Sequence, residues 1–273
     1  MTEWEPRTNF DAYEDVESFE NYRTDAELRA YRHERLEKHE PYVALLTRLG
    51  AAPGGLDVID IGAGSSAFLY ALAAAGLLRH GVGVEPSASR HAFAERWRLD
   101  EGHTRIENIQ ANFVDMKLPE SSFDRFTAID DTYLYLRPED DHYPERLLEA
   151  AHSALRPGGI LLLDFRHDLA LAREIPREGR SFDVDLPPTN AFASAHYRQV
   201  PSDDRRRLLN ESVYVSRSGE ERRKVEITEV CDVDALVETA RSVGFASVHS
   251  YGDLRLAPFD AETSPRGVVV ATK

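Results

Sequence analysis

A short motif of one acid and two glycines is the part of this sequence best suited to hold a ligand. Asp60 lies inside the apolar run Val58 to Ile61, and Gly62-Ala63-Gly64 follows directly. The apolar run predicts a buried strand, and glycines let the backbone turn sharply and approach a ligand closely. The alanine-rich stretch Ala67 to Ala75 then predicts a helix whose positive end faces the same place. This pattern of strand, glycine loop and helix suits a nucleotide-like ligand.

A second acid, Glu85, ends the next predicted strand and lies 23 residues after Gly62. A carboxylate there can accept hydrogen bonds from two ribose hydroxyl groups, which fits a dinucleotide or an adenosyl ligand. Asp60 is the residue that distinguishes between these two kinds of ligand. Its charge would repel a pyrophosphate in the loop and attract the sulfonium and ammonium groups of S-adenosylmethionine.

These residues resemble the first motif of the class I S-adenosylmethionine-dependent methyltransferases, which has an acid two residues before its first glycine. The small-molecule branch of this superfamily is the nearest likeness. The resemblance implies S-adenosylmethionine as cofactor, S-adenosylhomocysteine as its product, and Tyr22 as a contact of the methionine carboxylate. It also implies Asn112 as an adenine contact in place of the commoner Asp. The full predicted cofactor site is Tyr22, Asp60, Gly62, Ala63, Gly64, Glu85, Pro86, Asn112, Phe113 and Asp130.

Two later stretches strengthen the resemblance. A predicted helix from about Tyr143 to Leu155 is followed by the turn Arg156-Pro157-Gly158-Gly159 and an apolar strand ending at Phe165. A closing helix from Asp232 to Gly244 precedes two more predicted strands. The resemblance therefore implies an α/β, doubly wound, seven-stranded and mostly parallel sheet of the Rossmann-like methyltransferase type, with an antiparallel last strand.

Three regions of the chain are predicted around this pattern. Residues 1–50 form a helical lid, in which Thr24 and Glu27 make a capping box and Pro41 opens a second helix. Residues 51–165 and 229–273 form the core. Residues 166–228 alternate apolar and polar side chains, which predicts an inserted antiparallel meander of three strands. So long an insertion is expected either to wall the substrate site or to join two subunits in a homodimer.

Candidate catalytic residues follow the fourth and fifth predicted strands. A general base is needed only for an acceptor that arrives protonated, and His167 and Tyr133 are the candidates. The alternative is catalysis by alignment alone. The acidic run from Glu139 to His142 could suggest a metal site, but acids are also favourable at a helix N-terminus, and no metal is expected.

The composition limits the partners. The chain has 273 residues, a formal net charge of −15 and a single cysteine, Cys231. So acidic a protein is poorly suited to bind a nucleic-acid backbone. The lone cysteine excludes an intrachain disulfide, no apolar run is long enough to span a membrane, and no secretory signal is evident. A cytoplasmic protein without membrane or nucleic-acid partners is expected.

The favoured function is methylation of an oxygen or nitrogen atom of a small polar metabolite. Two alternatives stay open at this point. One is an NAD(P)-dependent oxidoreductase that uses the loop of Gly62 and Gly64 together with Glu85. The other is a protein that binds the cofactor without catalysis.

Overall fold

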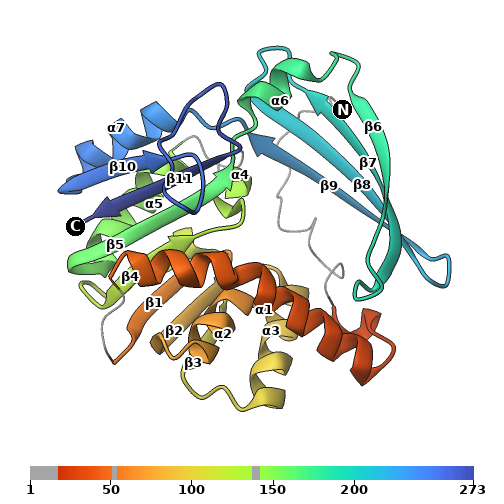
Figure 1. The fold of residues 1–273 in the computed structure, drawn as a ribbon, viewed down its shortest axis with the longest axis horizontal. Helices are drawn as coiled ribbons and strands as arrows, with labels where there is room; N and C mark the ends of the chain where they lie inside the picture. Colours follow the sequence, from red (N-terminus) through yellow and green to blue (C-terminus); the bar gives the residue numbers. More distant parts are fainter. Residues whose placement is uncertain (1–17, 51–53, 137–141) are drawn as a thin grey trace.

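The computed structural model describes residues 18–50, 54–136 and 142–273, and its larger part is a seven-stranded sheet (Figure 1). The strands lie in the order β10-β11-β5-β4-β1-β2-β3. All run parallel except β11, which is antiparallel to both of its neighbours. This confirms the predicted mostly parallel sheet. Its strands are β1 (Leu56–Ile61), β2 (Leu78–Glu85), β3 (Ile106–Gln110), β4 (Phe123–Ala128), β5 (Leu155–Arg166), β10 (Ser247–Tyr251) and β11 (Arg266–Thr272).

Helices cover both faces of this sheet. Alternate residues of β1 belong to different apolar clusters, since Val58 packs with α1, α2 and α3 while Ile59 and Ile61 pack with α5 and α7. Successive side chains of a strand point to opposite faces, so the sheet is the middle layer of three. The helices are α1 (Asp25–Arg48), α2 (Ala67–Ala74), α3 (Ala88–Glu101), α4 (Thr132–Leu136), α5 (Tyr143–Ala154) and α7 (Val233–Val243).

The ends of these helices follow local signals in the sequence. Thr24 and Glu27 form the predicted capping box at the start of α1. The side chain of Ser87 caps α3, and Asp232 caps α7. Gly244 ends α7 in the left-handed conformation, with φ of 113°. Each cap satisfies backbone groups that the first or last helical turn leaves without partners.

Helix α1 is continuous where two helices were predicted. Pro41 lies inside it and does not end it. A proline inside a helix costs about 3 kcal/mol because it removes a hydrogen bond and crowds the preceding turn. Leu45 and Leu46 are fully buried against the sheet, and burial of two such side chains offsets that cost. Although α1 has 24 residues, neither it nor any other helix within the described ranges is apolar enough to cross a membrane.

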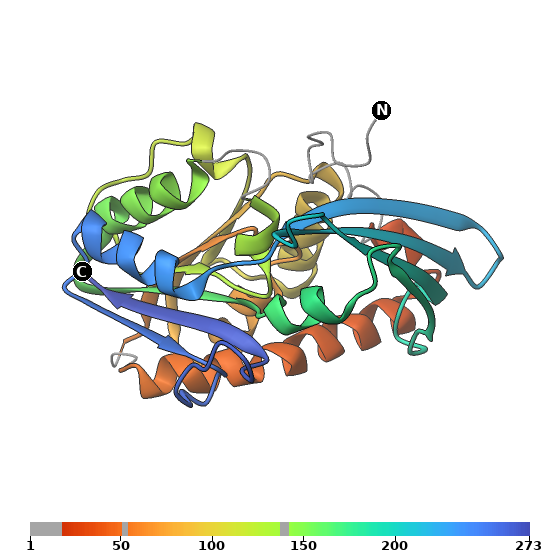
Figure 2. The ribbon, with the colours of Figure 1, turned by 90° about the horizontal axis from the view of Figure 1, so that it is seen from above.

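The insertion is a second, antiparallel sheet in the order β6-β7-β8-β9, which stands beside the core (Figures 1 and 2). The predicted meander is confirmed, but it has four strands and not three. Strand β6 was missed although Phe182 and Val184 alternate with polar residues, because two apolar side chains make only a short pattern, and in the structure all six residues of the strand are exposed. The insertion contains α6 (Leu169–Glu174), β6 (Arg180–Asp185), β7 (Phe192–Pro201), β8 (Arg207–Ser216) and β9 (Glu221–Glu229).

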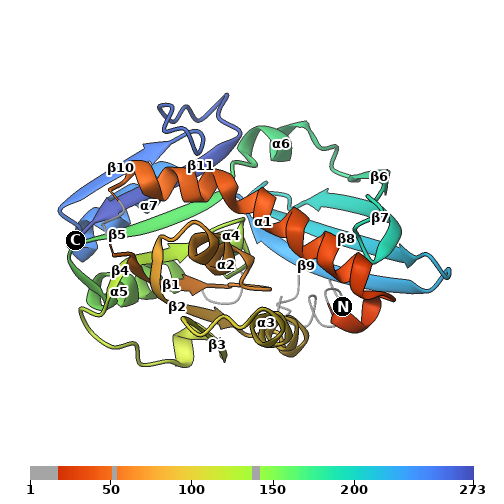
Figure 3. The same ribbon diagram turned by 60° about the horizontal axis from the view of Figure 1, so that its bottom comes forward.

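Helix α1 joins the two sheets. Its C-terminal half lies on the core, and its N-terminal half extends toward the insertion (Figures 2 and 3). There Glu27 makes an ion pair of 3.1 Å with Arg217, and Glu34 accepts a hydrogen bond from the hydroxyl of Thr189. Helix α1, which belongs to the region predicted as a lid, therefore contacts both the core and the insertion.

Candidate functional site

A cavity of about 320 Å³ lies at the carboxyl ends of the central parallel strands. The ends of parallel strands meet at one edge of a sheet, which is where open α/β sheets bind ligands. The structure brings nine of the ten predicted cofactor residues to this one cavity: Asp60, Gly62, Ala63, Gly64, Glu85, Pro86, Asn112, Phe113 and Asp130.

The glycine loop after β1 packs tightly against its neighbours. The N–H groups of Gly62 and Ala63 both donate to the carbonyl of Val84, at 2.8 and 3.1 Å. Gly62 has a φ of 67°, and a Cβ atom on it would lie 2.4 Å from Cγ2 of Thr132. Only glycine fits there without moving α4, so the loop can present its backbone to the cavity.

Glu85 is buried at the end of β2, with its carboxylate held in place by two backbone groups. Its Oε2 accepts from the N–H of Gly64 at 2.8 Å, and its Oε1 accepts from the N–H of Ser87 at 2.9 Å. These bonds orient the carboxylate beside the glycine loop. That is the position from which it can accept hydrogen bonds from a ribose.

Asp60 is the most deeply buried acid of the cavity lining, with 2% of its surface exposed. Burial raises its pKa to about 7, the hydrogen bond of 2.6 Å from Thr127 opposes this, and the charges of Glu85 and Asp130 add to it. An acid in this state gains from a cation placed next to it. The sulfonium and ammonium groups of S-adenosylmethionine supply such charges, so the residues present fit that ligand.

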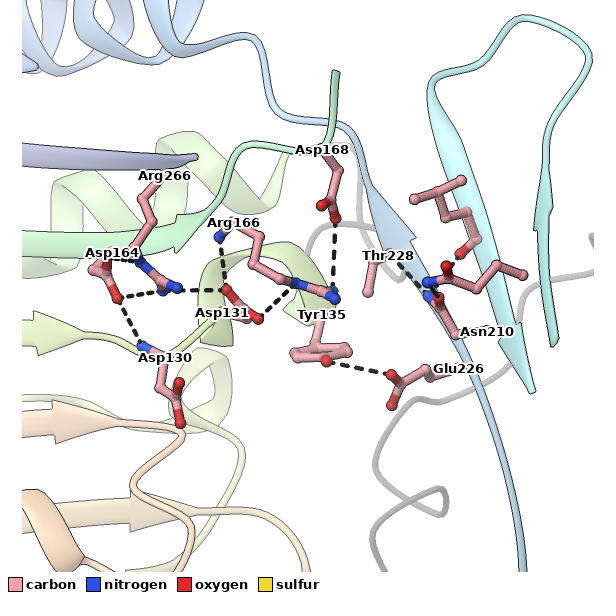
Figure 4. Close-up of polar contacts among 12 residues, drawn as sticks. Asp130, Asp131, Tyr135, Asp164, Arg166, Asp168, Asn210, Glu226, Thr228 and Arg266 are labelled. Carbon is pink, nitrogen blue, oxygen red and sulfur yellow. Dashed lines mark hydrogen bonds and ion pairs between the residues drawn. The ribbon is translucent and has the colours of Figure 1, made fainter. Parts of the chain in front are cut away.

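The turn after β4 has a strained backbone, and hydrogen bonds with residues of β5 hold it in place. Asp130 and Asp131 both have positive φ, at 53° and 73°, which is unfavourable for side chains other than glycine. Oδ2 of Asp164 accepts from the N–H of Asp130, and Oδ1 of Asp131 accepts from the N–H of Arg166 (Figure 4). These contacts fix the position of the Asp130 carboxylate at the cavity.

Asp164 also anchors α1 over the cavity. This fully buried carboxylate accepts from the Tyr42 hydroxyl at 2.6 Å and makes two bonds of 2.6 Å with the guanidinium of Arg266. Burial, followed by the charge of Asp164, raises the pKa of Tyr42 above its usual range, which keeps the hydroxyl protonated as a donor.

One face of α1 contributes three side chains to the cavity: Arg35, Lys38 and His39. Nζ of Lys38 lies 2.6 Å from Oδ2 of Asp130. Burial by itself would raise the pKa of Asp130. The charges of Lys38, Arg35 and His39 outweigh this effect and lower the pKa to about 2. His39 donates from Nδ1 to the carbonyl of Arg35 at 2.6 Å, and burial lowers its pKa to about 4, so its imidazole is neutral at neutral pH.

The sequence reasoning missed these three residues. Their spacing was the available signal, because positions i, i+3 and i+4 share one helix face. That face is charged, however, and a charged helix face predicts exposure to solvent. Only the tertiary structure shows that this helix crosses the ends of the strands.

The insertion contributes to the cavity through β9. Lys224 lines it and is 9% exposed, and its Nζ lies 2.6 Å from Oε2 of Glu226. The hydroxyl of Tyr135, at the end of α4, donates to the other oxygen of Glu226 at 3.2 Å. Figure 4 shows this contact between the core and the insertion. One end of the cavity is therefore made by the insertion.

Three predicted residues lie outside the lining of this cavity. Tyr22 packs on Tyr31 and Phe93, with ring centroids 4.9 and 6.0 Å apart. Tyr133 is buried and stacks on Phe165. His167 donates from Nε2 to the carbonyl of Ala261 at 2.8 Å and packs on Phe259. The role of Tyr22 was implied by the resemblance, and Tyr133 and His167 were chosen because they follow the fourth and fifth strands. The direction of each side chain depends on packing that neither argument reveals.

Within residues 18–50, 54–136 and 142–273, no group of three or more His, Cys, Asp or Glu side chains could hold a metal ion. Residues 139–141 of the acidic run lie outside these ranges, and His142 is the N-cap of α5.

Comparison with known proteins identifies the central part of the chain. Residues 58–159, from the glycine motif to the Pro-Gly-Gly turn, match the family model described as a methyltransferase domain. No curated protein sequence matches this chain.

Several solved structures share the fold. CcbJ methyltransferase from Streptomyces caelestis has a TM-score of 0.68 at 18% identity, over 85% of this chain and 88% of its own. An S-adenosylmethionine-dependent methyltransferase from Clostridium acetobutylicum has a TM-score of 0.71 at 11% identity, over 86% and 91%. CalS10, an amino pentose methyltransferase from Micromonospora echinaspora, has a TM-score of 0.54 at 18% identity, over 91% and 95%.

Proposed function

We propose that this chain, an S-adenosylmethionine-dependent methyltransferase by its domain and fold, methylates an oxygen or nitrogen atom of a small polar metabolite. The observation that carries the proposal is the lining of the cavity. Residues of the glycine loop, of α1 and of β9 line one space, so a cofactor held at the strand ends has the insertion as its neighbour.

The residues of the chain have separate tasks in this proposal. The cofactor, when bound, supplies a methyl group on a positively charged sulfur. Asp60 and Glu85 orient the cofactor, and Asn112 accepts or donates at the adenine. Lys224, Glu226 and Tyr135 contact polar groups of the acceptor. Alignment in an enclosed space and exclusion of water then account for much of the rate.

A methyl acceptor that arrives protonated needs a group that takes up its proton. His167 and Tyr133 remain predictions for this role, although neither side chain lines the cavity. The positions of Tyr135 and the Lys224–Glu226 pair favour these groups as the ones nearest the acceptor. An acceptor that arrives unprotonated needs no base, and alignment alone then suffices.

A polar acceptor with a nucleophilic nitrogen agrees with what CalS10, of similar fold, is named for, since an amino pentose is small and polar. The matching family model and the solved structures named above are of methyltransferases, which favours this proposal over an NAD(P)-dependent oxidoreductase. Equilibrium binding checks this directly: S-adenosylhomocysteine is expected to bind, and NAD is not.

For the insertion, we propose the role of a substrate wall, because Lys224 lines the cavity. The other arrangement, a homodimer through the inserted sheet, predicts a dimeric mass in solution, which light scattering measures. A fully active monomer would contradict the homodimer and support the role of the inserted sheet as a substrate wall.

A methyl-transfer assay tests the proposed acceptor site. Labelled S-adenosylmethionine is incubated with a panel of small polar amines and alcohols, and transferred label is counted. For an acceptor found in this way, Lys224→Met is expected to lower the transfer rate at least tenfold. Arg223→Met is the matched control, since Arg223 is the neighbouring residue on the opposite face of β9 and is 66% exposed. Equal rates in the two variants would contradict the substrate wall.

A further inference from the structure

Acidic and basic side chains that line the cavity come from different parts of the fold. The acids Asp60, Glu85 and Asp130 lie at or just after the carboxyl ends of strands of the sheet, whereas Arg35 and Lys38 come from α1, which crosses the ends of these strands (Figure 3). The methionyl end of S-adenosylmethionine also carries both signs, with an ammonium and a carboxylate on one carbon atom. A carboxylate placed among the three acids would be repelled by them.

The order of the strands decides where the methionyl end lies. Glu85 ends β2 and Asn112 follows β3, so the ribose and adenine occupy this side of the cavity. The rest of the cofactor then extends past the loop after β1 toward the turn after β4, where Asp130 lies. Lys38 is in contact with Asp130 there, at 2.6 Å. The methionyl end therefore meets α1.

Four cationic side chains line the cavity among the described residues: Arg35, Lys38, Arg90 and Lys224. Arg90 lies on the ribose side, since a Cβ atom on Gly64 would be 3.2 Å from its Nη1 and Gly64 donates to Glu85. Lys224 lies on the insertion, in an ion pair of 2.6 Å with Glu226. Of these four, Arg35 and Lys38 are the two whose charges act on Asp130.

We infer that Arg35 and Lys38 of α1 form the site for the methionyl carboxylate of the cofactor. Arg35 presents a planar guanidinium suited to a carboxylate, and its Cζ atom lies 6.0 Å from the centroid of the Tyr31 ring. Lys38 has three N–H donors and can contact a carboxylate while it keeps Asp130. This site takes the place predicted for Tyr22, which packs instead on Tyr31 and Phe93.

The inference rests on the cofactor and not on the methyl acceptor, so binding alone can test it. The probes are S-adenosylmethionine and decarboxylated S-adenosylmethionine. The second probe keeps the sulfonium and the ammonium and lacks only the carboxylate. Calorimetry measures both dissociation constants for the parent protein and for the double variant Arg35→Met/Lys38→Met. The deciding quantity is the loss in affinity for S-adenosylmethionine divided by the loss in affinity for the decarboxylated probe. Effects unrelated to the carboxylate cancel in this ratio.

The double variant is expected to bind S-adenosylmethionine roughly ten- to a hundredfold more weakly, since charge-assisted hydrogen bonds are lost. Its affinity for the decarboxylated probe is expected to fall by less than about threefold. Arg90→Met is the control, a cation of the same cavity that should affect both probes by the same factor. Equal losses for the two probes in the double variant, or no loss for either, would overturn the inference.

Two further measurements keep the outcomes apart. Lys38→Met alone changes a side chain that is 47% exposed, and it decides the question if the double variant does not fold. Retained binding of the decarboxylated probe shows that a variant is folded. A parent protein that binds neither probe would remove the cofactor assignment itself, and this carboxylate site with it.

Discussion

The hydroxyl of Tyr42 donates a hydrogen bond of 2.6 Å to Oδ2 of Asp164, and this contact ties helix α1 to strand β5. The two residues are 122 positions apart in the chain, and both are buried. Because α1 also carries Arg35, Lys38 and His39, the same contact determines where these side chains meet the cavity.

Tyr42→Phe is therefore expected to destabilise the protein. It removes a hydrogen bond to a charged group, which is worth about 1.5–3 kcal/mol of unfolding free energy. Urea denaturation measures the change. Tyr251→Phe is the control, because no partner for the hydroxyl of Tyr251 is found among the described residues, and it should change the unfolding free energy by less than about 0.5 kcal/mol. Similar values for the two variants would contradict the anchoring role of Tyr42.

Gly62→Ala and Gly102→Ala form a matched pair for the glycine loop. Both glycines have a φ of 67°, so alanine suffers about 1–2 kcal/mol of backbone strain at either position. At Gly62 the new Cβ would also lie 2.4 Å from Thr132, whereas at Gly102 nothing lies within 4 Å. We expect Gly62→Ala to cost about 1–3 kcal/mol more than Gly102→Ala in thermal or urea unfolding. Equal costs would mean that the loop moves away from α4 without penalty.

The stability of the protein should depend on the ionisation of Asp60. Burial raises the pKa of this carboxyl from 3.8 to about 7 in the folded state. The folded state then binds more protons than the unfolded state between these two values, so unfolding free energy falls as pH rises from about 4 to 7. The size is on the order of 1.4 kcal/mol for each pH unit of the shift. Asp60→Asn should remove this part of the pH dependence, and urea midpoints from pH 4 to 8 measure it. An identical profile in the variant would show that Asp60 does not titrate in this range.

Glu85→Gln should weaken cofactor binding and leave the fold intact. The substitution keeps the shape of the side chain but removes its charge and one acceptor, which is expected to weaken S-adenosylhomocysteine binding roughly ten- to a hundredfold. Glu107→Gln changes an exposed acid on the neighbouring strand β3 and should bind like the parent protein. Calorimetry compares the two. Unchanged affinity in Glu85→Gln would exclude Glu85 from the ribose site.

Much of the fold could be predicted because its signals are local. A cap such as Thr24 with Glu27 or Asp232 acts within one helical turn, and the glycine loop after Ile61 needs only its own backbone conformation. The limits of this approach appear where distant packing opposes a local signal. Pro41 marks a helix start by local rules, but the buried residues that follow it keep α1 continuous.

The residues that line the cavity also fall into those that local signals predict and those that only distant packing brings there. By itself the sequence determined the residues at the carboxyl ends of the parallel strands, including Asp60, Glu85 and Asp130, because parallel strands place these ends at one edge of the sheet. The tertiary structure alone decided that α1 brings Lys38 to Asp130, 92 residues away, and that β9 brings Lys224 to the same cavity. It also decided that Tyr133 packs against Phe165 and that His167 packs against Phe259. The direction of a helix face or of a returning strand depends on contacts between segments far apart in the chain, and the spacing of residues along one segment carries no record of them.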